Sequence, residues 1–480
     1  MNLKKFGGKK VSILKDSWIY KMLLCFIGTV ETAIKNSAIY SIFTKEIIKK
    51  KEKGIFEKFL YSIINFLRKI FKKIKLDKVF ANSIFAKTHI WVAITIVLAP
   101  LLETMQIVLF VLASILSFGL KILLEEDFKF RYTPVNAWII LFVLIYILSA
   151  ITSLSVMTSI QIAMLVVSFI LFYFVIINSV TTEKHLKIMV TSFISIGLII
   201  SIYGIYQYLF AGTFSSASFV DKEMFQDITT RVSGTFDNPN VMGEYLLLVI
   251  PVAMTFCFNS KKWLERIASI AITAIMVVCL ALTYSRGCYL GLIACIGIFL
   301  LLINLKFILL FIAGIIAVPF ALPQSIINRF SSIGNTNDSS TSYRISIWKG
   351  AIDMIKDYWY RPIGQGTVAF NRIYPLYSYS GVGAEHTHNL FLQLIIETGI
   401  LGIIAFIGLI FKFYQYLFNG LKKCKEKTMS INMIAYVSGM TGFIIQSMFD
   451  NTWYNNRIIL IFWIFIALGI STRNLIEKNN

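Results

Sequence analysis

The chain has 480 residues, of which 57% are apolar and 15% charged, and its mean hydropathy is +0.73. Soluble domains carry about 25% charged residues, so this composition argues against a water-soluble enzyme, while 27 Gly and 8 Pro argue against a fibrous or disordered chain. Many apolar runs have the ~17–25 residues that cross a bilayer as a helix. We therefore expect an all-α polytopic membrane protein.

Residues 1–88 hold most of the positive charge. The formal net charge is +21, and this segment alone has 20 Lys and Arg against 6 Asp and Glu. A basic block beside the membrane is typical of the cytoplasmic side, and because it leads into membrane helices we expect no nucleic-acid partner. Its apolar run at residues 22–30 is too short to span a bilayer.

Within the basic segment, residues 55–74 alternate apolar and basic side chains at helical spacing. This pattern predicts an amphipathic helix that lies in the membrane interface. The alternative is a helix that packs on a cytoplasmic or membrane partner.

Twelve spanning helices are expected, near residues 90–102, 105–124, 135–151, 158–178, 187–210, 241–259, 264–284, 287–303, 306–322, 389–417, 431–449 and 456–472. The first two come from one apolar run that Pro100 and Glu103 interrupt. Twelve spans place both termini and basic loops such as 422–427 in the cytoplasm, in agreement with the positive-inside rule. The chain then divides into a basic cytoplasmic N-terminal extension (1–88), nine helices (89–322), a large outside loop (323–388) and three helices (389–480).

Two outside loops are long, at about 211–240 and 323–388. In the second, the Ser, Thr, Asn and Gly residues at 331–342 predict a flexible stretch. Residues 343–360 then predict an amphipathic helix, which Pro362 and the following glycines end.

Several kinds of chemistry have no support in the sequence. There is no phosphate-binding GxxxxGK[ST] loop and no HExxH zinc motif. The dense acidic cluster at 125–127 falls on the cytoplasmic side, and the six cysteines form no CxxC pair. We therefore expect no nucleotide, no metal and no other cofactor.

Two of the four histidines, His386 and His388, lie together at the outer mouth of a spanning helix. Histidine titrates near neutral pH and is the commonest general base. The alternative is a pair that merely caps the helix.

Arginines gather on the outside. Arg286 lies between two apolar runs, where it either binds phosphate with paired donors or reaches to lipid phosphates. Arg231 precedes a turn-rich run with Asp237 and Asn240, and the alternative for Arg231 is an ion pair with Asp237.

The large outside loop adds Arg344, Arg361 and Arg372, and together these charges suit an anionic substrate. Glu397 falls inside a spanning helix, where an ionisable group is costly. For Glu397 we expect an ion pair with one of the arginines.

Four motifs in this order resemble those of O-antigen ligase and polymerase proteins. They are residues 234–240 (GTFDNPN), residues 284–287 (YSRG), the Arg344 helix that leads to Gly364 and Gly366, and the pair His388 and Asn389. The ligase pattern His-Asn-x9-Gly-x2-Gly is met by His388, Asn389, Gly399 and Gly402. The resemblance covers most of the chain after residue 88, and the basic extension departs from it.

The resemblance implies a GT-C-like fold in the bacterial cytoplasmic (inner) membrane. It implies transfer of a glycan from polyprenyl pyrophosphate to an acceptor on the outer face, without metal or nucleotide. The family's catalytic histidine corresponds to His388, and its pyrophosphate-binding arginines correspond to Arg286 and Arg231. The candidate substrate-binding residues around them are Arg344, Arg361, Arg372, Asn389, Asp237, Asn240, Glu397 and His386.

The chemistry agrees with these roles. Arginines can stabilise the charge that develops on a pyrophosphate leaving group, and His388 can accept the proton of the acceptor hydroxyl. Direct displacement inverts the anomeric carbon.

The identity of the acceptor is not determined by the resemblance. It is a growing glycan for a polymerase, a lipid or cell-wall acceptor for a ligase, and a protein for an oligosaccharyltransferase of the same superfamily. A flippase-like transporter is the alternative from another class, but we see neither the related halves nor the mid-membrane charges that transporters show.

Overall fold

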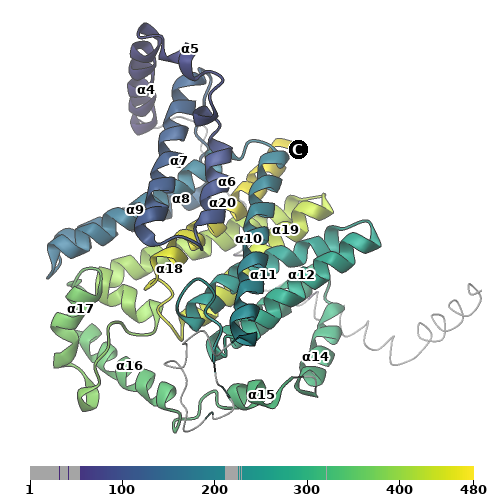
Figure 1. The fold of residues 1–480 in the computed structure, drawn as a ribbon. Coiled ribbons are helices and arrows are strands. Elements are labelled where there is room, and N and C mark those ends of the chain that lie inside the picture. The colour runs from purple at the N-terminus through teal and green to yellow at the C-terminus, as the bar shows by residue number, and fades with distance from the viewer. Residues whose placement is uncertain are drawn as a thin grey trace, which may run out of the picture.

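The computed structural model describes residues 55–210, 230–320 and 322–479, with four isolated positions at Thr32, Ile42, Phe225 and Ile228. Over these ranges the chain is helical and contains no β-strand (Figure 1). The prediction of an all-α polytopic membrane protein is confirmed. The apolar run at 22–30 and most of the outside loop at 211–240 lie outside the described residues.

Ten helices of the described ranges are long and apolar enough to cross a membrane. They are α7 (Thr104–Leu124), α8 (Pro134–Ile151), α9 (Val156–Ser179), α10 (Glu183–Leu209), α11 (Pro239–Asn259), α12 (Trp263–Ala281), α13 (Arg286–Ile303), α18 (Leu390–Lys423), α19 (Lys427–Ser447) and α20 (Asn456–Asn479). The other two predicted spans form shorter apolar helices, α6 (Thr88–Leu98) and α14 (Phe307–Ala317). Each has 11 residues, or about 16 Å, so neither crosses a ~30 Å hydrocarbon core by length.

The first predicted pair is a helical hairpin. The α-helix α6 ends at Leu98, just before Pro100, which cannot donate a backbone hydrogen bond. Glu103 then begins α7, and its backbone N–H donates to the Gln106 side chain at 3.3 Å. Hydroxyls join the two helices, since Thr95 Oγ1 and Ser114 Oγ lie 3.0 Å apart.

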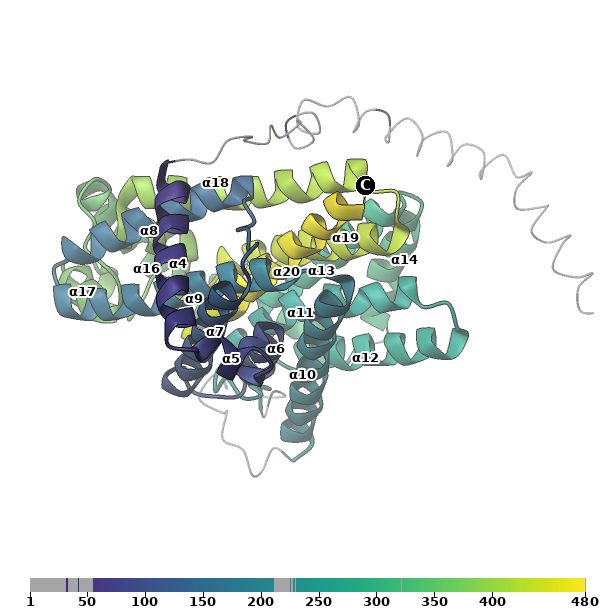
Figure 2. The ribbon, with the colours of Figure 1, turned by 90° about the horizontal axis from the view of Figure 1, so that it is seen from above.

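The centre of the bundle is formed by α11, α19 and α20, whose side chains are mostly buried. Figures 1 and 2 show α20 running through the middle of the molecule, with α10 and α12 to one side of it. Gly291 of α13 faces Gly442 of α19 so closely that a Cβ on Gly291 would lie 2.6 Å from the Gly442 carbonyl oxygen. Small residues at such a crossing let membrane helices approach closely, and this contact sets the start of α13 beside the end of α19.

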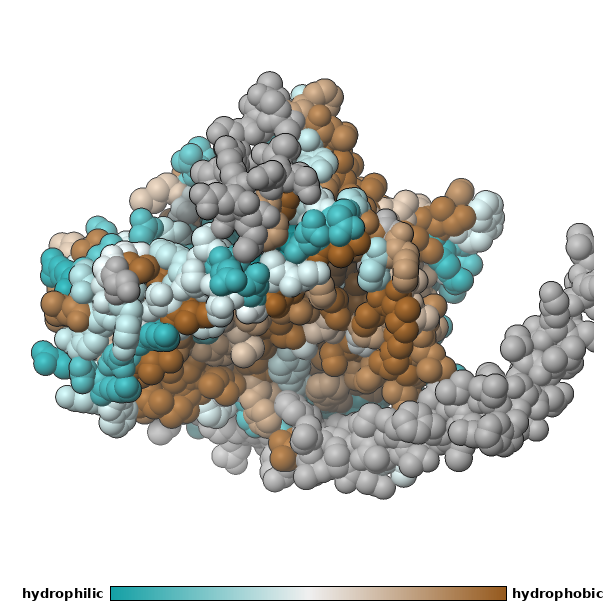
Figure 3. Space-filling view, turned by 90° about the horizontal axis from the view of Figure 1, so that it is seen from below, coloured by the Kyte–Doolittle hydropathy of each residue, from teal (hydrophilic) through white to brown (hydrophobic). Residues whose placement is uncertain are grey.

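The outward surfaces of the helices are apolar. Leu109, Leu116, Leu144 and Leu148 are each at least 60% exposed. Figure 3 shows a broad hydrophobic surface beside a hydrophilic margin. Such a surface suits contact with lipid rather than water.

The helices α4 (Ile55–Lys73) and α5 (Leu76–Phe80) lie apart from the bundle centre, at the top of Figure 1. Arg68 joins α4 to the end of α7 by donating to the carbonyl oxygens of Ile122 (2.8 Å) and Glu125 (2.7 Å). A helix leaves its last carbonyls unpaired, so this arginine satisfies them. The predicted amphipathic helix is present, with Phe59 and Phe66 exposed, and its place in the membrane interface stays a prediction.

The segment predicted to be the large outside loop, residues 323–388, folds into α15 (Gln324–Ser331), α16 (Ser339–Tyr358) and α17 (Thr367–Ile373), along the bottom of Figure 1. The name outside loop is kept for this segment. Ile347, Met354 and Phe370 form its own small core against Ile396 of α18. The flexibility of residues 331–342 stays a prediction, although residues 339–342 belong to α16. Asp338 is fully buried and caps α16 by accepting from the Thr341 backbone N–H at 3.0 Å.

Gly399 interrupts α18 with φ 70° and ψ −177°, a conformation that favours glycine. At this break the Ile400 N–H donates to the Trp359 carbonyl oxygen at 2.8 Å. A Cβ on Gly399 would lie 3.1 Å from that oxygen. The first glycine of the His-Asn-x9-Gly-x2-Gly pattern thus anchors the outside loop on α18.

Candidate active site

A cavity of about 750 Å³ lies between the starts of α11, α13 and α16 and the loop that joins α19 to α20. Its walls include six of the site residues predicted from the sequence. These are Arg231, Asn240, Arg286, Arg344, His386 and His388. The fold therefore brings together residues that lie more than 150 positions apart in the chain.

The cavity is built for negative charge. Three helices begin at its wall, α11 near Asn240, α13 at Arg286 and α16 at residues 339–341. The helix dipole makes such starts favourable for anions. Four arginines also line the cavity, at 231, 286, 329 and 344.

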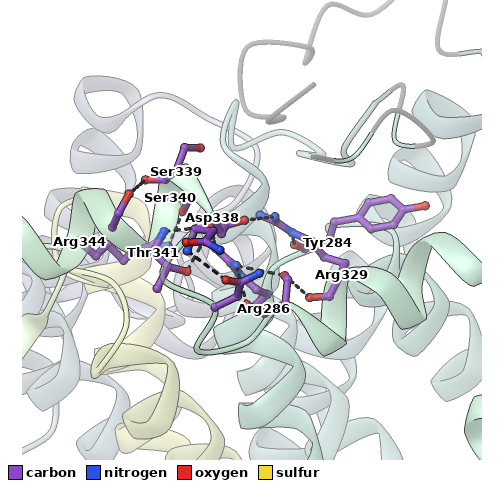
Figure 4. A network of polar contacts seen from close by, with 12 residues as sticks. Tyr284, Arg286, Arg329, Asp338, Ser339, Ser340, Thr341 and Arg344 are labelled. Atoms are coloured by element: carbon purple, nitrogen blue, oxygen red, sulfur yellow. Dashed lines mark hydrogen bonds and ion pairs between the residues drawn. The ribbon is translucent and has the colours of Figure 1, made fainter. Parts of the chain in front are cut away.

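Arg286 is held by a carboxylate that it shares with a second arginine (Figure 4). Its Nη2 lies 2.6 Å from Asp338 Oδ1, and Arg329 Nη1 lies 3.3 Å from Asp338 Oδ2. Burial acts to raise the pKa of Asp338, but the hydrogen bond and charge of Arg286 outweigh it and hold this pKa below its usual value. Asp338 therefore stays ionised and holds both guanidinium groups in place.

Arg231 reaches the cavity from the segment before α11 and is almost fully buried. Its Nε donates to the Thr283 carbonyl oxygen at 2.7 Å, and its Nη2 donates to Asn240 Oδ1 at 2.9 Å. The alternative of an ion pair with Asp237 is wrong, because the Asp237 side chain is 96% exposed and lies 3.7 Å from Arg457.

His388 is paired with Asp450, which the sequence analysis did not select. His388 Nδ1 lies 2.9 Å from Asp450 Oδ1, while Asp450 Oδ2 accepts from Asn240 Nδ2 at 2.9 Å. Burial acts to raise the pKa of Asp450, but the hydrogen bond to His388 and the charges of His388 and Arg344 hold it below its usual value. An ionised Asp450 can accept a hydrogen bond from Nδ1–H of His388. In an uncharged imidazole this arrangement leaves Nε2 as the nitrogen without a proton.

Aromatic packing fixes the position of Asp450 in the wall of the cavity. Trp453, three residues later, packs its ring edge-on against Phe142 (5.7 Å), Phe406 (5.3 Å) and Phe462 (5.5 Å). Such aromatic pairs contribute about 0.5–1.5 kcal/mol each beyond the area they bury. The short loop between α19 and α20 is therefore fixed to the core.

His386 supports His388 from the side. Its Nδ1 accepts from the His388 backbone N–H at 3.1 Å, and the two ring centroids are 4.1 Å apart. Burial lowers the pKa of His386 to about 4. His386 is therefore neutral at neutral pH and can accept this hydrogen bond.

Two turns of the site use a left-handed backbone that non-glycine residues rarely adopt. His388 has φ 48° and Tyr284, just before Arg286, has φ 50°. Such conformations cost about 1–3 kcal/mol each and gather at functional sites. Asn389 compensates at the first turn, because its Oδ1 caps α18 by accepting from Phe391 and Leu392.

Five predicted site residues do not line the cavity. Arg361 and Arg372 lie on the outer surface of the loop, and Asn389 caps α18. Asp237 points to the exposed surface. Among the described residues no arginine pairs with Glu397, so the expected ion pair is wrong, and its carboxylate accepts from Gln393 Nε2 (2.8 Å) and the Gly366 N–H (3.2 Å) instead.

Three residues of the site were missed. Asp450 is the only acid in the short loop at 448–455, and Asp338 is the only acid between 323 and 352. A lone acid in an arginine-rich outside segment is a usable signal, because it must pair with a cation or stay in water. Arg329 had no distinguishing signal among the loop arginines.

The donor types in the site would also suit a metal ion. Ligand atoms of His386, His388 and Asp450 lie within 4.8 Å of one another, and zinc accepts such ligands. However, Nδ1 of each histidine already takes part in an internal hydrogen bond. Four arginines in the wall also oppose a divalent cation.

Part of the chain that forms the cavity is similar to a known protein family. Residues 271–407 match the family model described as O-antigen ligase. The matched segment includes Arg286, Arg329, Asp338, Arg344 and His388, whereas Arg231 and Asp450 lie outside it. No curated protein matches the chain. The protein is thus a polytopic helical membrane protein that is similar to the O-antigen ligase family over residues 271–407.

Proposed function

We propose that the protein transfers a glycan from a polyprenyl-pyrophosphate carrier to an acceptor hydroxyl at the outer face of the bacterial cytoplasmic membrane. The observation that carries this proposal is the pairing of His388 with Asp450 at the edge of a cavity lined by four arginines. One part of such a site accepts a proton, and the other part holds negative charge.

In the proposed reaction the acceptor oxygen attacks the anomeric carbon, and the bond from that carbon to the pyrophosphate oxygen breaks. The acceptor proton moves to His388 Nε2, and Asp450 stabilises the imidazolium that forms. The electron pair of the broken bond stays on the polyprenyl pyrophosphate. Attack from the opposite side inverts the anomeric carbon.

Arg286 and Arg231 stabilise the leaving group. Both are fixed by hydrogen bonds before substrate binds, Arg286 by Asp338 and Arg231 by Thr283 and Asn240. Preorganised donors need no rearrangement when charge develops, which is the usual source of a large electrostatic contribution. Arg329 and Arg344 add positive charge to the same wall.

Transfer is expected to be independent of divalent metal. Because arginines carry the positive charge, the purified protein in vesicles should transfer polyprenyl-linked glycan at an unchanged rate in excess EDTA. The product is followed by gel mobility, with Mg²⁺ or Zn²⁺ added back as the comparison. Loss of transfer in EDTA and recovery with zinc would instead assign a metal to His386, His388 and Asp450.

The side of the membrane can be tested by cysteine labelling in a variant without the six native cysteines. Thr336→Cys, in the outside loop, should react with a membrane-impermeant maleimide in intact cells. Lys425→Cys, in the basic loop between α18 and α19, should react only after the cells are opened. Both side chains are exposed, so burial does not account for a difference. The reverse labelling would place the active site in the cytoplasm.

A further inference from the structure

A second cavity of about 370 Å³ adjoins the active-site cavity within the outside loop. It is lined by Tyr343, Asn371, Tyr374, Pro375, Ser378, Gly381, Val382, Gly383, Ala384 and Glu385. Its volume lies in the range of small-molecule sites.

Tyr343 lies between the two cavities, since it lines both of them. Its ring centroid is 5.8 Å from that of His388, and its hydroxyl donates to the Gly383 carbonyl oxygen at 2.9 Å. A second link runs through Tyr454 of the first cavity, whose hydroxyl donates to Glu385 of the second at 2.6 Å. A molecule held in the second cavity is therefore close to the proposed general base.

The lining differs from that of the arginine-rich cavity. Among the described residues that form it there is no Lys, Arg or His. Tyrosine rings lie beside an amide, a hydroxyl and a carboxylate, from Asn371, Ser378 and Glu385. Tyrosine rings pack against the C–H faces of a sugar, and these polar groups match its hydroxyls, which both donate and accept. The chemistry suits a neutral sugar and not a phosphate.

Tyr374 lines the cavity, but its hydroxyl is closed off from the open space. The residue is 1% exposed, and its hydroxyl has no hydrogen-bond partner among the described residues. A buried polar group without a partner is costly, and such groups are rare in folded proteins. A turn of the ring toward the cavity would let a ligand hydroxyl supply the partner.

We propose that this second cavity, the tyrosine cavity, binds the acceptor, and that the acceptor is a sugar residue of a glycan. The inference rests on the proposed function. Sugar bound against Tyr343 would bring a hydroxyl close to His388, whose ring centroid lies 5.8 Å from that of Tyr343. The protein then acts on a saccharide acceptor rather than on a protein.

The first test uses two substitutions in the tyrosine cavity. Ser378→Trp places an indole in the cavity and should raise the acceptor KM at least tenfold. Tyr374→Phe removes only the hydroxyl and should lower kcat/KM for the acceptor about three- to tenfold, the value of one neutral hydrogen bond. The matched control is Tyr245→Phe, which removes a buried hydroxyl that also has no partner among the described residues but lies within α11. It should leave transfer unchanged.

Binding of undecaprenyl pyrophosphate to the purified variants separates the two sites. Ser378→Trp and Tyr374→Phe should bind it within twofold of wild type and melt at the wild-type temperature. If both variants transfer normally while His388→Ala does not, the acceptor cavity is wrong and the proposed function stands. If His388→Ala also transfers normally, the proposed function itself is wrong.

The acceptor class is tested on membranes from host cells that lack this protein. Periodate treatment, which cleaves vicinal diols of sugars, should abolish their capacity to accept glycan, and proteinase K should not. Loss of acceptor after proteinase K alone would make the acceptor a protein and overturn the inference.

Discussion

Replacement of His388 by alanine is expected to lower glycan transfer by about 10²–10⁴-fold, the usual contribution of a general base. Asp450→Asn should lower it by about 10²-fold or more, because an amide cannot stabilise the imidazolium at Nδ1. Asp450→Glu keeps the charge and should recover part of the rate, which a purely structural role would not predict. The rates are measured with purified protein in vesicles by the gel mobility of the glycan.

His386→Ala is the control for this pair. His386 accepts a hydrogen bond from the His388 backbone, whereas Asp450 pairs with the His388 side chain. The loss of the His386 side chain should therefore be milder, within about tenfold. A protein in which His386→Ala abolishes transfer while His388→Ala is nearly normal would have the two roles exchanged. Protein levels in the membrane should be normal for each variant, because both side chains line a cavity.

Arg286→Lys is expected to lower turnover by about 10²-fold or more, comparable to the loss of one oxyanion donor. Lysine keeps the positive charge but loses the planar fork that binds two oxygens at once. In the structure that fork holds Asp338 through Nη2 and Ser332 through Nη1. The variant should therefore lose both the orientation of its charge and the contact that holds it.

The matched control is Arg266→Lys, the same change at an arginine of α12 that donates to the Ser260 carbonyl oxygen. It should transfer at the wild-type rate. If the Arg286 and His388 variants both remain active at normal protein levels, the transferase proposal fails. A flippase-like transporter would then explain the cationic cavity better, and transport of lipid-linked glycan would be the next measurement.

Membrane crossing was predictable because it depends on local composition. A run of about 20 apolar residues must satisfy its own backbone hydrogen bonds in lipid, so it becomes a helix wherever it packs. All twelve predicted segments are helices, but α6 and α14 are too short to cross the membrane by length. The interruption at Pro100 and Glu103 separates α6 from α7 as expected. The sequence also predicted α4 and α16 from apolar periodicity alone.

Predictions from local sequence patterns were wrong or incomplete where a residue distant in the chain supplies the contact. Residues 331–342 have the composition of a flexible loop, yet Asp338 is buried there because two arginines, at 286 and 329, surround its carboxylate. Glu397 was expected to form an ion pair, yet its carboxylate accepts hydrogen bonds from Gln393 and from the Gly366 backbone N–H. In both cases the partner is decided by how the outside loop folds back on the helices.

The fold class, the positions of the helices and the candidate site residues His388, Arg286 and Arg231 could all be predicted from the sequence alone. Which of these residues meet depends on the tertiary structure. The partner of His388 lies 62 positions away at Asp450, and that distance is closed by the packing of α19 and α20 against α18. Hydropathy and helical periodicity act over a few turns, whereas a buried charge takes its partner from whatever the fold brings within reach.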